Sequence, residues 1–176
     1  MSETHPFGFF IPKNTKYLFL GSFPGKREYG YEWFFANKRN QFWSILENVY
    51  ETELRTKEEQ QEVFTKLRMA ISDIILECDR KANNNSDTNL KGLKINSEAI
   101  TNVIINYKIE AVYFSSRFAE KLFRRYFKEL ISKFPKIKLV TLPSPSPRYA
   151  IINKSEKINI YKKLLPKLPK SKPQTF

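Results

Sequence analysis

The stretch from Tyr17 to Trp43 places the strongest constraint on the fold. It opens with a short apolar run, residues 17–20, and then breaks at residues 21–25, Gly-Ser-Phe-Pro-Gly. An apolar run that stops at glycine and proline is typical of a buried parallel strand that ends in a tight loop. In an open α/β sheet, ligands bind at the loops that follow the carboxyl ends of the strands. We therefore expect residues 21–25 to line a binding site.

Aromatic side chains crowd the segment that follows this turn. They are Tyr29, Tyr31, Trp33, Phe34 and Phe35. Such a density of aromatic residues close to a strand end predicts a pocket with flat walls. The small residues at positions 21, 22 and 25 would let the backbone come close to whatever the pocket holds.

Strand and helix patterns alternate along the rest of the chain. Two more apolar runs predict strands, and the helical spacing of apolar residues predicts five helices. The strands are 17–20, 111–114 and 139–142, and the helices are about 40–50, 58–67, 97–107, 116–134 and 154–165. This alternation is typical of a parallel sheet with helices on both faces.

Two segments fit the alternation less clearly. Residues 69–76 are largely apolar but contain Asp73. Burying a carboxylate without a partner is costly, so Asp73 should cap a neighbouring loop or be placed for a direct role. Residues 78–90 are polar and rich in asparagine, which predicts a loop.

The third predicted strand leads into residues 143–148, Pro-Ser-Pro-Ser-Pro-Arg. Three prolines make this segment rigid, and its small hydroxyls and backbone N–H groups could grip phosphates without a cost in side-chain entropy. The alternative is an ordinary proline-rich connection. Since both loops follow the carboxyl ends of parallel strands, we expect them to leave neighbouring strands and to face one cleft.

The formal net charge of +13 and the pI near 9.7 are the strongest global signals. They favour nucleic acid as a partner, through long-range attraction and counterion release; the alternative is a basic protein that binds no polyanion. One cysteine and one histidine rule out an all-Cys/His zinc site or an iron–sulfur cluster held by a single chain. The glycines also lack the spacing of a nucleotide-binding loop, so we expect neither metal nor cofactor.

The length of 176 residues suits a single domain over residues 1–176, with a Lys- and Pro-rich tail over 166–176 that we expect to fray. No apolar run approaches the roughly 20 residues of a membrane helix. The amino terminus lacks the pattern of a signal peptide. We therefore expect a cytoplasmic protein with no membrane partner.

Three motifs, in this order, resemble the uracil-DNA glycosylase superfamily. They are Gly-Ser-Phe-Pro-Gly at 21–25, Phe-Ala-Asn-Lys-Arg-Asn-Gln-Phe-Trp at 35–43, and Leu-Pro-Ser-Pro-Ser-Pro at 142–147. The resemblance covers about residues 17–150. It is nearest to the hypoxanthine-DNA (deoxyinosine) glycosylases and then to the mismatch-specific uracil glycosylases. It implies a three-layer α/β/α sandwich with a short, mainly parallel central sheet, in agreement with the predicted elements.

The resemblance also implies an activity. Proteins of this family are DNA glycosylases, and we expect a monofunctional, monomeric enzyme that hydrolyses the N-glycosidic bond of hypoxanthine or uracil in DNA. The nucleotide would be flipped out of the duplex, because its base cannot be reached inside it. Phe35 would stack on the flipped base, and Ser22, Phe23 and Ser144 would line the pocket. The leaving base carries negative charge, so preorganised N–H donors would stabilise its departure.

Phe23 stands where many members of the superfamily carry the Asp or Asn that positions water. In this respect the chain resembles the hypoxanthine branch, which has an Asn just before a Phe-Trp pair. The matching residue here is Asn40. An amide cannot be a strong base, but it can orient a water toward an electrophilic sugar. Alternatively Asn40 is the N-cap of the helix that it begins, and Asn37 is the second candidate for the water or the base edge. No histidine follows in the second loop, and His5 is expected at the surface.

Basic and hydroxyl side chains near the pocket are predicted to contact the DNA backbone. They are Lys26, Arg27, Lys38, Arg39, Ser146 and Arg148. Arg148 would reach a phosphate or fill the gap left by the flipped base, or else be a simple surface residue. Phe23 and the missing histidine support a second hypothesis, a nucleic-acid-binding protein of the same fold without activity. A third is an unrelated α/β enzyme that acts on a small anionic substrate.

Overall fold

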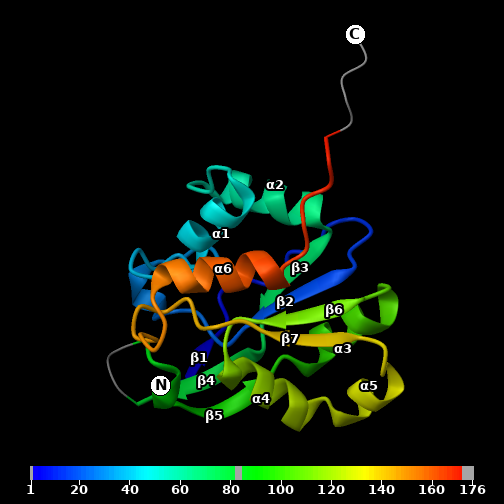
Figure 1. Cartoon of the computed structure of the whole chain (residues 1–176). Helices are drawn as coiled ribbons and strands as arrows, with labels where there is room; N and C mark the ends of the chain where they lie inside the picture. Colours follow the sequence, from blue (N-terminus) through cyan, green and yellow to red (C-terminus); the bar gives the residue numbers. More distant parts are fainter. Residues whose placement is uncertain (1, 82–84, 172–176) are drawn as a thin grey trace.

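The computed structural model describes residues 2–81 and 85–171. Within this part of the chain, four parallel strands form a central sheet in the order β3-β2-β6-β7 (Figure 1). They are β2 (Tyr17–Gly21), β3 (Met69–Asp73), β6 (Ala111–Phe114) and β7 (Lys138–Thr141). The three strands predicted from apolar runs are confirmed, with ends that differ by at most one residue.

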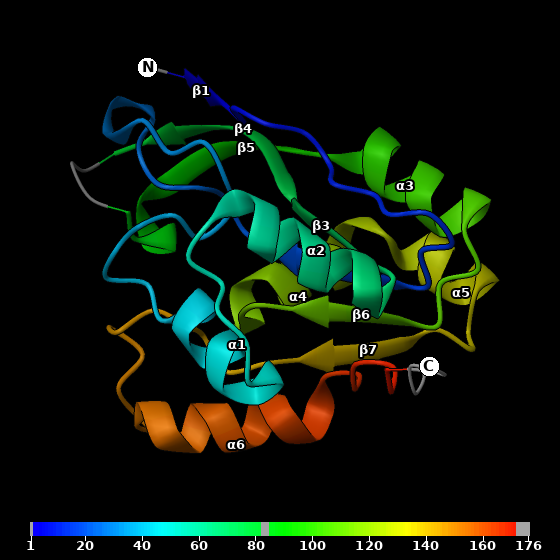
Figure 2. The ribbon, with the colours of Figure 1, turned by 90° about the horizontal axis from the view of Figure 1, so that it is seen from above.

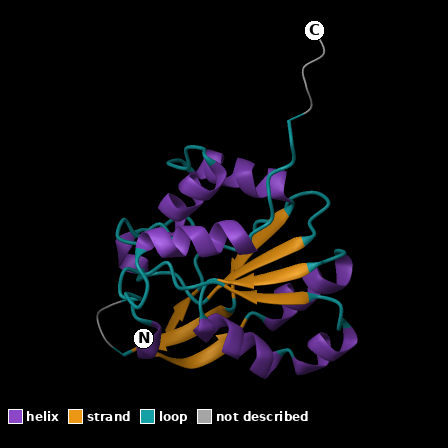
Figure 3. Ribbon diagram, viewed as in Figure 1, coloured by secondary structure: helices purple, strands orange, loops and turns teal. Residues whose placement is uncertain are grey.

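Helices cover both faces of this sheet (Figure 3). One face carries α1 (Phe42–Tyr50), α2 (Lys57–Leu67) and α6 (Lys154–Leu164), and the other carries α3 (Ser97–Asn106), α4 (Arg117–Tyr126) and α5 (Lys128–Lys133). Successive strand residues point to opposite faces, so Leu18 and Leu20 join the core beneath α3 and α4 while Phe19 joins the core beneath α1 and α2. This is the predicted three-layer α/β/α arrangement.

A second, antiparallel sheet links the amino terminus to the middle of the chain. Its strands are β1 (Ser2–Thr4), β4 (Ile75–Arg80) and β5 (Leu90–Ile95), in the order β1-β4-β5. The prediction of a polar loop over 78–90 is therefore wrong at both ends, and residues 82–84 lie outside the described residues. Strands like these are stabilised by their cross-strand neighbours, so their local sequence gives little signal.

The helix predicted over about 116–134 is two helices, α4 and α5, separated at Phe127. The backbone of Phe127 has φ −117° and ψ 31°, outside the helical range. Its ring is buried and stacks on that of Phe123, with the centroids 4.8 Å apart. Packing of this second aromatic ring into the core therefore accompanies the end of α4.

The tail predicted to fray over 166–176 begins in contact with the core. The hydroxyl of Tyr50 donates to the carbonyl oxygen of Pro166 at 3.0 Å, and Leu168 packs against the core beneath α1. Residues 172–176 lie outside the described residues. In the part that is described, no helix combines the length and apolarity needed to cross a membrane.

The carboxyl ends of the parallel strands lie at one edge of the sheet, where two loops emerge on the left of Figure 2. We call residues 22–41, after β2, the first loop and residues 142–153, after β7, the second loop. The prediction that they leave neighbouring strands is wrong, because β6 lies between β2 and β7. They nevertheless meet, since the backbone N–H of Gln41 donates to the carbonyl oxygen of Pro145 at 2.9 Å.

Candidate functional site

Helix α6 holds the two loops together around Gln41. The ammonium group of Lys157 donates to Oε1 of Gln41 at 3.1 Å and to the carbonyl oxygen of Ser146 at 3.0 Å. One turn further along α6, the hydroxyl of Tyr161 donates to the carbonyl oxygen of Pro143 at 2.7 Å. The second loop is thereby fixed against the start of α1.

Asn40 lies at this junction and is half-buried. Its Oδ1 accepts from the backbone N–H of Phe42, the first residue of α1, at 2.9 Å, and Oδ1 of Asn37 accepts from the N–H of Arg39 at 2.9 Å. Asn40 is therefore not the N-cap of α1: Gln41 occupies that position without a side-chain cap, and Asn40 makes a turn contact with the first residue of the helix. Among the described residues, Nδ2 of Asn40 has no hydrogen-bond partner, so the amide keeps free donors.

Phe35 supplies the aromatic wall beside this amide. Its ring stacks on Phe42 with the centroids 4.0 Å apart and the planes at 29°. Its backbone lies in the left-handed region, with φ 55°, which is uncommon for a bulky residue and has to be held by the surrounding packing. Because Phe35 is only half-buried, part of its side chain remains open.

The prediction that His5 lies at the surface is wrong, because its side chain is a buried part of this site. Its side chain is 3% exposed, and Nε2 lies 2.8 Å from Oδ2 of Asp73. The backbone N–H of Phe7 donates to Nδ1 at 3.3 Å, so the ring proton sits on Nε2 and His5 donates to Asp73. The ring also makes an edge contact with Phe23, at 5.8 Å between centroids. Pairing of β1 with β4 carries His5 here, because its N–H donates to the carbonyl oxygen of Leu76 at 2.7 Å.

Asp73 ends β3 with its carboxylate against Gly21, the last residue of β2. A Cβ atom added to Gly21 would lie 2.2 Å from Oδ1 of Asp73 and 3.3 Å from Cζ of Phe35. Asp73 therefore does not cap a loop: it pairs with His5 and lies beside the aromatic wall. No hydrogen bond to its Oδ1 is found among the described residues.

Two charged residues, Arg80 of β4 and Asp87 between β4 and β5, fix the beginning of the first loop. The hydroxyl of Ser22 donates to Oδ1 of Asp87 at 2.7 Å. Burial raises the pKa of Asp87 above its ordinary value, and the hydrogen bond from Ser22 opposes that shift. Arg80 donates to the carbonyl oxygen of Pro24 at 3.1 Å, and its guanidinium lies 5.9 Å from the centre of the Phe23 ring. Sequence reasoning missed Asp87, since it lies in a stretch predicted to be an isolated polar loop.

The hydroxyls of the second loop are turned into the loop itself. Oγ of Ser144 accepts from the N–H of Ser146 at 3.2 Å, and Oγ of Ser146 accepts from the N–H of Arg148 at 3.3 Å. Hydroxyl–backbone turns of this type pre-order a loop. The predicted rigidity thus comes from these turns and from α6 as well as from the prolines.

The predicted DNA-contacting residues differ in how free they are. Lys38, Arg39 and Arg148 are exposed. The side chain of Lys26 is only 11% exposed, and its ammonium group pairs with Glu28 at 2.9 Å. The side chain of Arg27 lies outside the part of the structure that is described.

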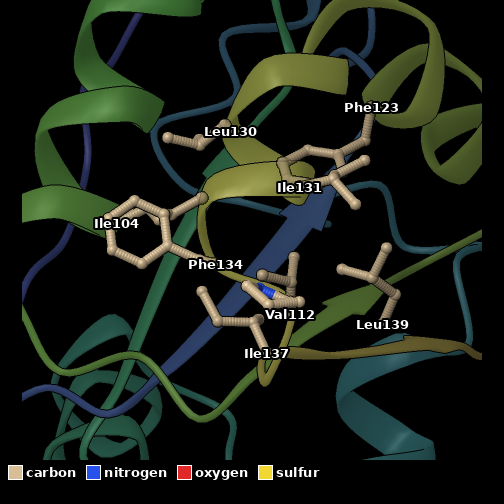
Figure 4. Close-up of a pocket in the computed structure, with 9 residues that line it drawn as sticks. Ile104, Val112, Phe123, Leu130, Ile131, Phe134, Ile137 and Leu139 are labelled. Atoms are coloured by element: carbon tan, nitrogen blue, oxygen red, sulfur yellow. The ribbon is translucent and has the colours of Figure 1, made fainter.

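A small cavity lies elsewhere, between α3, α5 and the face of β6 and β7 (Figure 4). Its volume is about 30 Å³, and its lining is apolar, including Ile104, Val112, Leu130 and Phe134. This volume is close to that of one or two water molecules, far below that of a nucleobase. The cavity is therefore a packing gap, separate from the two loops.

The fold is shared with a solved protein. The chain is similar to the solution NMR structure of a candidate uracil DNA glycosylase from Methanosarcina acetivorans, with a TM-score of 0.70 and 19% sequence identity. The match covers 93% of this chain and 99% of that one. At this identity the likeness establishes the fold, so the class defined so far is a three-layer α/β/α domain with a candidate site at the strand ends.

A family model gives the second step. The model described as the uracil DNA glycosylase superfamily matches residues 7–168. The chain belongs to this superfamily, and the resemblance inferred from the three motifs is confirmed. Membership supports DNA glycosylase activity, with DNA as the partner, at the level of the family. The comparison with curated proteins gives no match.

Proposed function

We propose that this protein is a DNA glycosylase that flips a deaminated base, hypoxanthine or uracil, out of DNA and hydrolyses its N-glycosidic bond. The observation that carries the proposal is the meeting of the two strand-end loops at the Gln41–Pro145 hydrogen bond, next to the amide of Asn40. A flipped base would enter between these loops and stack on the open part of Phe35.

Asn40 is the group proposed to orient the attacking water. Its Oδ1 has one lone pair left after accepting from Phe42, and its Nδ2 has free donors. Holding water close to the sugar carbon in the right direction can supply a large part of a rate enhancement without a strong base. Asn37 is the second candidate. Its neighbours Ala36 and Lys38 are both exposed, and it lies three residues further from the start of α1 than Asn40 does.

Asp73 would select against adenine and cytosine, the bases from which hypoxanthine and uracil arise. Hypoxanthine and uracil both carry a ring N–H at the edge where adenine and cytosine carry a ring nitrogen lone pair. A carboxylate oxygen accepts from the former and repels the latter, and His5 holds Asp73 in one orientation. The same charge opposes the departure of an anionic base, so this selection would be obtained at some cost in rate.

Exposed basic residues at the mouth would bind the DNA backbone. Lys38, Arg39 and Arg148 are exposed and free to do so. Ile151, in the same second loop, is 83% exposed, which is unusual for an apolar residue. An apolar wedge is well suited to fill the gap left by a flipped base, so we assign that role to Ile151 and a phosphate contact to Arg148.

One observation favours a second candidate function. Phe23, at the position where many relatives of the superfamily position water, packs against His5 and carries no polar group. A protein of the same fold that binds nucleic acid without cleaving the glycosidic bond would tolerate this residue.

The proposed function is tested with labelled duplexes that contain one deoxyinosine or one deoxyuridine. After incubation and alkali treatment, strand scission at the lesion is expected, and an undamaged duplex should stay intact. The Asn40→Ala protein, purified in parallel, excludes a contaminating glycosylase. Tight binding to these duplexes without scission would favour the second candidate instead.

Binding to the backbone leads to a salt-dependence prediction for Arg39→Gln. Loss of one phosphate contact should reduce the slope of log Kd against log salt concentration by about 0.9 on duplex DNA, for any sequence. Lys26→Gln should change the slope less, because Glu28 already pairs with Lys26. The matched control is Lys133→Gln. Lys133 is an exposed lysine at the end of α5, just before the amino end of β7 and so at the end of the sheet opposite the two loops. Fluorescence anisotropy over a salt series measures the slopes, and an unchanged slope for Arg39→Gln would exclude that contact.

A further inference from the structure

Lys157 is a buried lysine that the reaction as described above does not use. It lies in the second turn of α6 and is 1% exposed. Besides its hydrogen bonds to Gln41 and Ser146, its ammonium group lies 5.6 Å from the centre of the Tyr149 ring. Among the described residues, no carboxylate forms an ion pair with it.

A buried charge of this kind is unfavourable for stability. Removing an ammonium group from water is costly, and neutral hydrogen-bond acceptors compensate for it less well than a carboxylate does. Burial lowers the pKa of Lys157 accordingly. A methionine or leucine at this position would pack against Tyr149 without that cost, so packing alone does not explain a lysine here.

The two acceptors of Lys157 belong to different loops. Gln41 ends the first loop and directly follows Asn40, and Ser146 lies in the middle of the second loop. The backbone bond from Gln41 to Pro145 lies beside these two contacts. One ammonium group therefore ties together the two chain segments whose separation decides where the Asn40 amide stands relative to the second loop.

We propose that Lys157 is a positioning residue, which sets the distance between the first and second loops and so places Asn40 for its role in base excision. The catalytic part of this inference rests on the proposed function. Lys157 does not reach the reacting atoms itself, because it is buried and two of its three N–H donors are bound to the two loops.

The test compares Lys157→Met with Lys163→Met, which makes the same change at an exposed lysine of the same helix. Native-state hydrogen exchange should show that the Gln41 amide loses about tenfold or more of its protection in Lys157→Met, because local opening of the loops becomes easier. Amides inside β2 and β6 should keep theirs, and Lys163→Met should match the wild type at every site.

Excision is measured on the same proteins. The single-turnover rate on a lesion duplex should fall by about tenfold to 100-fold in Lys157→Met, with little change in Kd, since a small misplacement of a positioning group is enough for such a loss. Gln41→Leu removes one of the two contacts of Lys157 and leaves the bond to Ser146, so it should reproduce part of the effect. The double variant should be no worse than Lys157→Met alone, because Lys157→Met already removes the bond between Lys157 and Gln41.

Unchanged protection of Gln41 in Lys157→Met would overturn the proposal, whatever happens to the rate. Additive losses in the double variant would overturn it as well. An inactive wild type would refute the proposed function, and hydrogen exchange would still decide whether Lys157 sets the spacing of the loops.

Discussion

Asn40→Ala is expected to lower the single-turnover rate of base excision by about 100-fold or more. The physical reason is loss of orientation: the amide stands where the two loops meet, and its Nδ2 has no hydrogen-bond partner among the described residues. The measurement is the rate of alkali-sensitive strand scission with enzyme in excess over a deoxyinosine or deoxyuridine duplex. Kd for the duplex should change little.

Alanine also removes the hydrogen bond from the N–H of Phe42, so stability has to be separated from catalysis. Loss of one such hydrogen bond costs about 1 kcal/mol of unfolding free energy. Asn40→Ser keeps an oxygen that can accept from this N–H but shortens the side chain and removes the amide; it should be nearly as stable as the wild type and as slow as Asn40→Ala. Asn37→Ala loses a similar turn contact in the same loop and should keep most of the rate. A fast Asn40→Ser enzyme, or a slow Asn37→Ala enzyme, would move the assignment away from Asn40.

The second large effect is expected from Gly21→Ala. An added Cβ would overlap Oδ1 of Asp73, at 2.2 Å, and press on the Phe35 ring. Asp73 cannot simply swing away, because it is short, buried and bonded to His5. We expect the unfolding free energy to fall by about 1–3 kcal/mol, as for other overpacked sites, and the excision rate to fall because both pocket residues are displaced.

Gly21→Ala tests the effect of crowding alone, without a contribution from backbone strain. Gly21 is not at a positive φ, so alanine adds no backbone strain there. Gly8→Ala is the matched control, since nothing lies within 4 Å of its added Cβ. Urea unfolding gives the stability change, and both effects should be absent in the control. If Gly21→Ala were as stable and active as the wild type, the close contact of Asp73 with the β2 end would not exist in solution.

The local sequence was sufficient for three of the four described parallel strands, all but β3, and for most helices. Buried parallel strands are apolar on both faces, so the runs at 17–20 and 111–114 stand out without any tertiary information. The motifs at 21–25 and 142–147 lie at the ends of such strands, and the motif at 35–43 leads into α1, which is why the family could be recognised from the sequence. Strands β4 and β5 could not be, because they depend on each other and on β1 for their pairing.

By itself, then, the sequence determined the order of the layers, the position of the two loops and the family. Only the tertiary structure brought His5 to Asp73, 68 residues away, and Lys157 to Gln41, 116 residues away. Contacts over such separations leave no periodicity in the chain: each residue has an ordinary neighbourhood in sequence and acquires its partner only when the strands and α6 have packed. The polar groups of the site are therefore placed by the fold, whereas the elements that carry them are encoded locally.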